Sequence, residues 1–326
     1  MLLGEIKKKD TSIYIHHKRR HLYSVMLLLL MVLTLVVGCR NDVPKTNAAY
    51  YWSTEFSLDD EKIAFMQKHN IRKLYVRYFD VVVDVDGRPV PNATLRVCSS
   101  VPNGVRVVPV VYIVNDCMRG KNNGLAEKIL KRILQMSETN DIGKVEEIQI
   151  DCDWTPSTHD AYFNFLNELR SLAREKGIIL SATIRLHQLS ETPPPVDKGV
   201  LMMYNTGDFT QLTCSKPILD VKDALPYLRG LKDYPLPLSA AYPIFGWNIL
   251  FRGGKYVGIM HADDDLPVLS DDSIVQRQPE LEDILAARSA VGKRSAKAND
   301  EMILFDLNQK NIKRFKPIEY EKIFNR

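Results

Sequence analysis

The fold is decided by the stretch Val145–Trp154, which reads Val-Glu-Glu-Ile-Gln-Ile-Asp-Cys-Asp-Trp. Its apolar set is Ile148, Ile150, Cys152 and Trp154, and its polar set is Gln149, Asp151 and Asp153. Successive side chains of a strand point to opposite faces, so the amide and both carboxylates should share one face. This pattern favours a barrel strand, whose outward residues pack under helices and whose inward residues near the carboxyl end enter a polar pocket. Alternatively, Asp153 caps the helix that follows Thr155-Pro156-Ser157.

Segments typical of strands and helices alternate on both sides of this stretch. We expect further strands over residues 49–53, 71–80, 105–114, 178–187, 200–205, 236–245 and 302–307. Alternation of this kind predicts a parallel sheet with helical crossovers. No glycine-rich phosphate loop follows the first strand, which disfavours a nucleotide-binding open sheet. Because polar residues end many of the strands, we predict an α/β fold, a (β/α)8 TIM barrel with irregular parts and a long insertion before the last strand.

The amino terminus is typical of an exported protein. Basic residues precede an apolar run over 25–37, which is followed by Gly38 and Cys39. The run is shorter than the roughly 20 residues of a spanning helix, which favours a secretory signal over an uncleaved membrane anchor. We predict a signal peptide over 1–38, a tether over 39–48, and a barrel domain over 49–326 with its insertion at about 247–297. The Gly38-Cys39 ending resembles the lipobox of bacterial lipoproteins, which implies lipid on Cys39, a membrane partner and location on the bacterial cell envelope.

Charge and cysteine usage exclude several classes of function. The net charge of +4 includes the basic leader, so the body is near neutral and no nucleic-acid partner is expected. The cysteines after Cys39 show no metal-binding spacing, and His261-Ala262-Asp263-Asp264-Asp265 matches no calcium loop. We therefore expect no metal and no cofactor. The sequence leaves the oligomeric state open.

The ends of barrel strands supply the candidate site. We take Asp151 and Asp153 as candidate catalytic residues, although Asp151 could instead form a structural ion pair with Arg185 inside the barrel. The candidate substrate-binding residues are Arg77, Arg185, His187, Tyr204, Asn205, Tyr242, Trp247 and Asp306. Paired carboxylates can protonate a glycosidic oxygen and stabilise the developing positive charge. Aromatic faces stack on sugar rings. These residue types indicate a carbohydrate partner.

Two segments resemble a known family. Asp151-Cys152-Asp153 resembles the core of the acidic motif of chitinase-type (family 18) glycoside hydrolases, and Leu201–Asn205 is similar to their Met-x-Tyr-Asp segment on the sixth strand. That family's motif ends in a glutamate acid two residues beyond its last aspartate, where this chain has Thr155. Asn205 likewise replaces the aspartate. Residues 50–306 as a whole resemble an uncharacterised family of bacterial lipoproteins with glycoside-hydrolase-like barrels.

The first hypothesis is a membrane-anchored, exported lipoprotein that acts on or binds a poly- or oligosaccharide. As a hydrolase it would use Asp153 as general acid, Asp151 to orient groups or stabilise charge, and Tyr204 to hold the substrate. The alternative is a non-catalytic glycan-binding or cell-envelope structural protein on a degenerate barrel. Thr155 at the glutamate position favours that alternative.

Overall fold

The computed structural model describes residues 47–120, 123–260 and 266–324. The predicted signal peptide, Cys39 and the segment His261–Asp265 lie outside the described residues, as does most of the tether. In the described part of the chain, no helix has both the length and the apolar character needed to cross a membrane.

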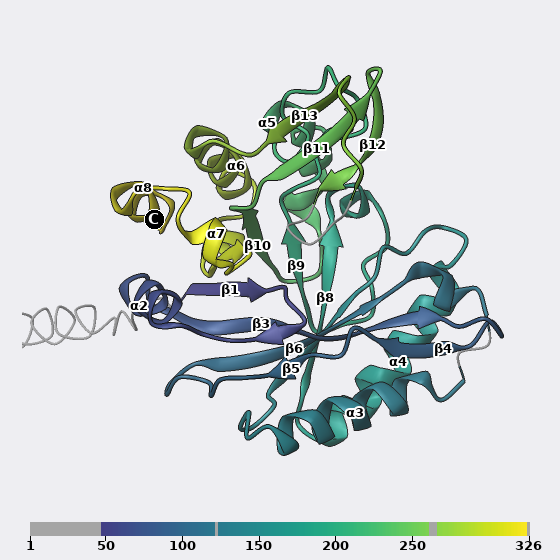
Figure 1. The fold of residues 1–326 in the computed structure, drawn as a ribbon. Coiled ribbons are helices and arrows are strands. Elements are labelled where there is room, and N and C mark those ends of the chain that lie inside the picture. Colours follow the sequence, from purple (N-terminus) through teal and green to yellow (C-terminus); the bar gives the residue numbers. More distant parts are fainter. Residues whose placement is uncertain (1–46, 121–122, 261–265, 325–326) are drawn as a thin grey trace, which may run out of the picture. The chain divides into compact units, whose positions relative to one another are not determined.

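Eight parallel strands close into a ring, because β1 pairs with both β3 and β14. In ring order they are β1 (Asn47–Tyr51), β3 (Ile71–Val83), β6 (Arg106–Ile113), β7 (Glu147–Asp151), β8 (Ile179–Arg185), β9 (Lys198–Met202), β10 (Leu238–Pro243) and β14 (Met302–Phe305). The predicted barrel is therefore confirmed (Figure 1). The ring places the carboxyl ends of all eight strands at one face.

The alternation along β7 is as the sequence indicates. Ile148 and Ile150 pack in the outer apolar layer under the helices. Gln149, on the other face, is fully buried and accepts a hydrogen bond from the Tyr50 hydroxyl at 2.7 Å. Asp151 accepts one from the Thr183 hydroxyl of β8 at 2.6 Å. The polar face of β7 thus points into the barrel.

The interior of the barrel below these groups is filled by side chains. A separate apolar cluster occupies it, formed by Ala48, Tyr50, Tyr75, Val108, Val110, Val200, Met202, Ala241 and Ile303. At the amino ends of the strands, Lys73 pairs with Glu301 and Lys198 pairs with Glu147, both at 2.6 Å. The barrel interior is therefore a packed core that is closed by ion pairs at its amino-terminal end.

Helices surround the ring unevenly. The α-helices are α2 (Asp60–Lys68), α3 (Leu125–Thr139), α4 (His159–Glu175), α5 (Val221–Ala224), α6 (Leu281–Gly292), α7 (Gln309–Ile312) and α8 (Pro317–Phe324). The 3-10 turns are η1 (Asn115–Met118), η2 (Leu186–Ser190), η3 (Tyr227–Asp233) and η4 (Ala296–Asn299). Figure 1 shows α3 and α4 side by side along one flank, with α6, α7 and α8 near β10 and β1. α5 and η3 are separate elements, because Pro226 between them has no N–H to continue the helical ladder.

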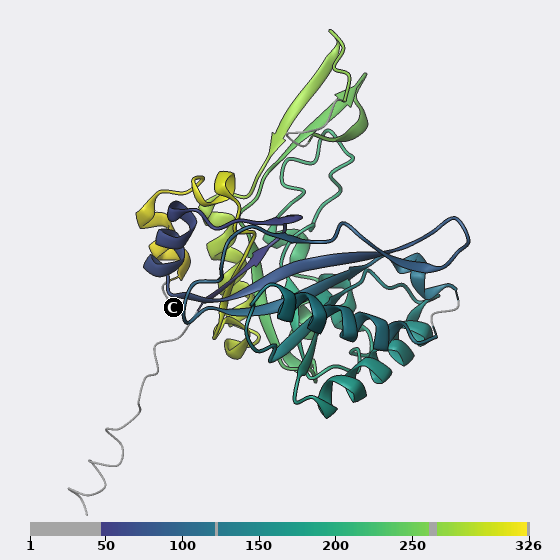
Figure 2. The same ribbon diagram turned by 60° about the horizontal axis from the view of Figure 1, so that its bottom comes forward.

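Strands replace a helix in the connection from β3 to β6. β4 (Pro89–Asn92) pairs antiparallel with the end of β3, and β5 (Arg96–Val97) pairs with β2 (Glu55–Phe56). A second irregular part lies between β10 and β14, where the long insertion was expected. It contains the antiparallel strands β11 (Trp247–Arg252), β12 (Lys255–Met260) and β13 (Asp272–Arg277), then α6 and η4. Figure 2 shows this small sheet projecting away from the ring.

Candidate functional site

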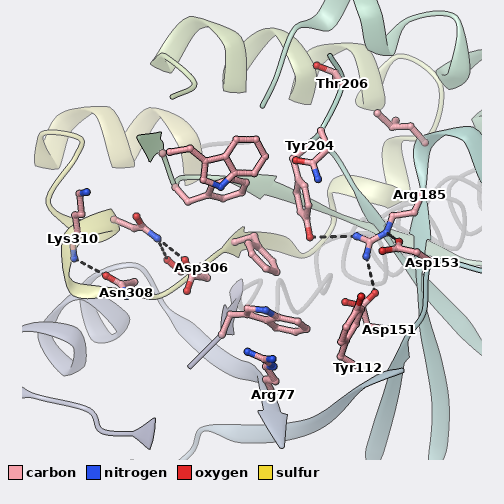
Figure 3. A pocket seen from close by; sticks show the side chains of 18 of the residues that line it. Arg77, Tyr112, Asp151, Asp153, Arg185, Tyr204, Thr206, Asp306, Asn308 and Lys310 are labelled. Carbon is pink, nitrogen blue, oxygen red and sulfur yellow. Dashed lines mark hydrogen bonds and ion pairs between the residues drawn. The ribbon is translucent and has the colours of Figure 1, made fainter. Parts of the chain in front are cut away.

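A cavity of about 880 Å³ opens at the carboxyl ends of the barrel strands. Its lining comes from within β3 and β6, from the ends of β7, β8 and β14, from the segments that follow β1, β7, β8, β9, β10 and β14, and from the insertion. Most ligand pockets have volumes of roughly 300–1,000 Å³, so this one suits a small molecule or a few sugar units. Figure 3 shows its polar groups gathered on two sides.

The first polar group is centred on Arg185, at the end of β8. Its Nη2 donates to Asp151 Oδ1 at 2.9 Å and its Nε donates to Asp153 Oδ1 at 2.5 Å. Its Nη1 lies 3.4 Å from the Tyr204 hydroxyl. One guanidinium therefore joins both carboxylates of β7 and a tyrosine that follows β9 (Figure 3).

The two carboxylates differ in burial. Asp151 is buried at the cavity floor, whereas the Asp153 side chain is 56% exposed. Burial raises the pKa of Asp151 above its usual value, while Arg185 and the Thr183 hydroxyl act in the opposite direction. Burial alone would lower the pKa of Arg185, but Asp151, Tyr204 and Asp153 raise it well above its usual range. Asp151 and Arg185 form the internal ion pair considered from the sequence, and Asp153 is the carboxylate that a ligand can reach.

The second polar group is Asp306, which directly follows β14. Its carboxyl group accepts a hydrogen bond from Asn311 Nδ2 of α7, and it lines the cavity with Asn308 and Lys310. Burial raises the pKa of Asp306 to about 7, although hydrogen bonds from Asn311 and from the backbone of Asp306 and Trp52 oppose that shift. A carboxyl group in this range can be neutral near physiological pH.

Aromatic side chains form the wall between these two polar groups. Trp52 and Phe305 lie 5.5 Å apart between ring centroids, and Tyr204 lies 5.0 Å from Phe305. Phe245 contacts Tyr204 at 5.6 Å and Trp247 at 5.4 Å. Such a run of rings supplies the apolar faces on which sugars stack.

Arg77 stands beside this wall on β3. Its guanidinium lies 5.4 Å from the Trp52 ring centroid, a cation–π arrangement. The same group donates from Nε to Asp80 Oδ1 at 2.7 Å and also from Nη2 to Asp80 Oδ2. Arg77 is thus held by Asp80 and faces the cavity as a positioned donor.

The structure brings most of the predicted site residues together. Those that line the cavity are Arg77, Asp151, Asp153, Arg185, His187, Tyr204, Asn205, Trp247 and Asp306. Asn205 does so with a φ of 58°, a left-handed conformation that Asn accepts more readily than most residues. Sequence reasoning missed Trp52, Tyr112, Tyr227, Phe245, Phe305 and Asn311 as lining residues. All but Asn311 are aromatic, and no charge or motif separates such residues from core aromatics.

Tyr242 was predicted to bind substrate, but it does not line the cavity, so this prediction is wrong. Its side chain is fully buried in the outer layer, where its hydroxyl donates to Asn299 at 2.6 Å. The neighbouring Ala241 belongs to the barrel interior instead. Because strand neighbours face opposite sides, Tyr242 points toward the helices and not toward a substrate.

Thr155 does not line the cavity either. Its hydroxyl lies 3.3 Å from Asn115 Nδ2 and 3.0 Å from Ser157, in the turn before α4. The last cavity-lining residue of the β7 segment is Asp153. The absence of a glutamate at position 155 therefore does not deprive the cavity of an acid.

No group of three or more His, Cys, Asp or Glu side chains suited to a metal ion occurs within residues 47–120, 123–260 and 266–324. Cys98, Cys117, Cys152 and Cys214 are free thiols.

Comparison with solved structures supports the fold. A chitinase from Chromobacterium violaceum aligns with a TM-score of 0.55 at 12% identity, over 86% of this chain and 98% of that one. The barrel is shared with chitinases. A chitinase from Bacteroides thetaiotaomicron aligns with a TM-score of 0.53 at 13% identity, over 86% of this chain and 94% of that one. The Bacillus cereus spore cortex-lytic enzyme SleL aligns with a TM-score of 0.53 at 13% identity, over 85% of this chain and 73% of that one. No family model and no curated protein sequence matches this chain.

Proposed function

We propose that this chain is an exported, lipid-anchored protein that binds an oligosaccharide in the barrel cavity and hydrolyses it. The observation that carries the proposal is the arrangement of Asp151, Asp153 and Arg185 beside a wall of aromatic rings, all in one cavity. Glycoside hydrolysis needs carboxyl groups around the scissile bond, together with surfaces that hold the sugar rings.

Within this proposal, the residues of the β7 side have separate roles. Thr183 donates to Asp151, and Asp151 accepts a hydrogen bond from the Arg185 guanidinium and so positions it. Arg185 in turn holds Asp153, which faces the cavity as an ion-paired carboxylate. One oxygen of Asp153 already accepts a hydrogen bond from the cationic Arg185 guanidinium, an arrangement suited to a negatively charged group. We therefore assign Asp153 the task of stabilising positive charge at the anomeric carbon or of taking a proton from water, in place of the general-acid role suggested by the sequence.

The names of the structural neighbours support a proposal for the substrate class. The solved neighbours are named as chitinases and as a spore cortex-lytic enzyme. We propose that the carbohydrate partner is a related amino-sugar polymer. The lipid on Cys39 would hold the barrel at the cell envelope, close to such a polymer. Loss of the protein from the membrane fraction on Cys39→Ala is the expected result of a test.

The central experiment measures the release of reducing ends from chitin oligosaccharides and from spore cortex fragments. We expect turnover by the wild-type chain and a loss of at least about 100-fold in Asp153→Asn, since positioned carboxyl groups contribute about 10²–10⁴-fold. Asp233→Asn, which changes an exposed carboxyl group at the end of η3, is the matched control. Equal rates for Asp153→Asn and wild type would refute the assignment.

A second candidate function is glycan binding without turnover. The pairing of both β7 carboxyl groups with Arg185 favours it, because such pairs can hold a binding site in place without any proton transfer. Calorimetry with the same oligosaccharides separates the two. Saturable binding that is lost in Trp247→Ala, with no reducing ends released, would select the binding protein.

A further inference from the structure

Three carboxyl groups line the cavity within the described part of the chain, and they differ in their partners. Asp151 and Asp153 both contact the Arg185 guanidinium. Asp306 forms no ion pair, and its side-chain partner is the neutral amide of Asn311. The cavity therefore contains one carboxyl group whose charge no cation offsets.

Asp306 also lies opposite the other two groups. In the ring of eight strands, β14 and β7 are separated by four steps in either direction. Their carboxyl ends therefore face each other across the barrel mouth, and Figure 3 shows Tyr204 between Asp306 and Arg185. The ring centroids of Tyr204 and Phe305 lie 5.0 Å apart. A ligand held on these rings would have Asp306 on one side and the Arg185 group on the other.

The surroundings of Asp306 favour its neutral form. Burial raises the pKa of Asp306 to about 7, so a large share of molecules carry the acidic proton in neutral and weakly acidic solution. The Asn311 amide donates to Oδ1, which opposes this shift in pKa but fixes the orientation of the carboxyl group. The arrangement differs from that of a carboxylate held by an arginine.

We propose that Asp306 is the proton donor of the cleavage reaction, an inference that rests on the proposed function. Asp306 gives its proton to the glycosidic oxygen while the bond from that oxygen to the anomeric carbon breaks. The bonding electron pair stays with the departing oxygen, which leaves as an alcohol. A water oxygen bonds to the anomeric carbon and its proton passes to the Asp153 carboxylate. Proton exchange with solvent restores both groups, so each cleavage consumes one water molecule.

A purely structural role gives opposite expectations for one variant. A carboxylate that only ties α7 to β14 would be ionised, and Asp306→Asn would destabilise the fold at pH 8. If the carboxyl group is held neutral, its ionisation opposes folding. The folded-state pKa lies above the ordinary 3.8, so the stability that Asp306 contributes is lost as pH rises toward about 7. The stability of Asp306→Asn relative to wild type should then be clearly greater at pH 8 than at pH 5.

The first test is therefore urea unfolding of wild type, Asp306→Asn and Asp233→Asn at pH 5 and pH 8. A gain in stability for Asp306→Asn over wild type that is larger at pH 8 than at pH 5 supports the neutral carboxyl group. A loss at pH 8 overturns the proposal. This test needs no substrate, so its result does not depend on whether the chain hydrolyses glycans.

The second test compares leaving groups. A proton donor matters most when the departing alcohol is a weak acid, so Asp306→Asn should lose at least about 100-fold in kcat for chitin oligosaccharides. It should lose much less for a dinitrophenyl glycoside, whose leaving group needs no proton. Asp233→Asn should match wild type on both substrates. Equal losses on both substrates would overturn the assignment, and no turnover by wild type would instead remove the proposed function together with this role for Asp306.

Discussion

Tyr50 donates its hydroxyl hydrogen to Gln149 Oε1 at 2.7 Å, across the barrel interior and between strands 99 residues apart in sequence. Both side chains are fully buried, so water cannot replace the bond if it is removed. Tyr50 also stacks on Tyr75, with ring centroids 4.8 Å apart. This contact lies directly beneath Asp151 and supports the floor of the cavity.

Tyr50→Phe should lower the free energy of unfolding by about 1–3 kcal/mol, the usual penalty for leaving one buried polar group unsatisfied. The ring packing is kept, so the loss reports on the Gln149 carbonyl. Urea unfolding measures it, with the more exposed Tyr256→Phe as control. An unchanged stability would mean that Gln149 finds another donor.

Arg185→Met should be more damaging, since it leaves the buried Asp151 carboxylate without its cation. Removal of one partner from a buried ion pair costs about 3–5 kcal/mol. Combining it with Asp151→Leu should recover part of the loss, because no uncompensated charge then remains. Arg96→Met, at the exposed pair with Glu55, provides the comparison and should show a far smaller change. A lower free energy of unfolding for the double variant than for Arg185→Met alone would contradict the ion-pair account.

Acid sensitivity should arise partly from His69. This side chain is buried against Phe324, Phe65 and Tyr320, with the Phe324 ring centroid at 4.7 Å. Burial lowers the pKa of His69 from 6.5 to about 4. The folded state therefore binds fewer protons than the unfolded chain between these values, and the free energy of unfolding falls as pH drops from 6.5 toward 4.

His69→Phe should remove up to about 3 kcal/mol of that pH dependence while keeping the stacking on Phe324. Urea unfolding at pH 7, 5.5 and 4.5 measures the difference between variant and wild type. The free energy of unfolding of the variant should increase relative to that of wild type as the pH falls. Parallel curves would show that protonation of His69 has no part in acid unfolding.

Asn311→Leu tests the neighbour of Asp306. The Asn311 amide donates to the Asp306 carboxylate and so lowers its pKa, in opposition to burial. Without that donor the pKa of Asp306 should rise further above 7. The alkaline limb of the kcat profile should move to higher pH, while the variant stays active below pH 6. A limb that does not move would show that another group controls it.

The sequence was most informative where polar and apolar residues alternate strictly. Along β7 this pattern correctly predicted which residues enter the barrel, and it led to Asp151, Asp153 and the pairing of Asp151 with Arg185. The alternation of strand and helix patterns predicted a parallel sheet, and the polar residues at the ends of many strands favoured the closed ring, which the structure confirms.

Other features depend on contacts that no local pattern carries. β10 reads Leu-Ser-Ala-Ala-Tyr-Pro, which has no clear polar face, so the orientation of Tyr242 could not be read from it. Trp52 and Phe305 resemble core aromatics in sequence and become cavity walls only once the ring closes. The environment of Asp306 depends on α7, whose Asn311 folds back onto the end of β14.

The filled interior decides how a long polymer can approach. Tyr50, Tyr75 and Val110 block the axis of the ring, and the Lys73–Glu301 pair closes it further down. A polysaccharide thus has no route through the molecule. A bound polymer must either lie across the open cavity, with sugar units extending beyond it on both sides, or insert one chain end into the cavity. The lengths of the first products released from a long polysaccharide would distinguish cleavage at internal bonds from cleavage at a chain end.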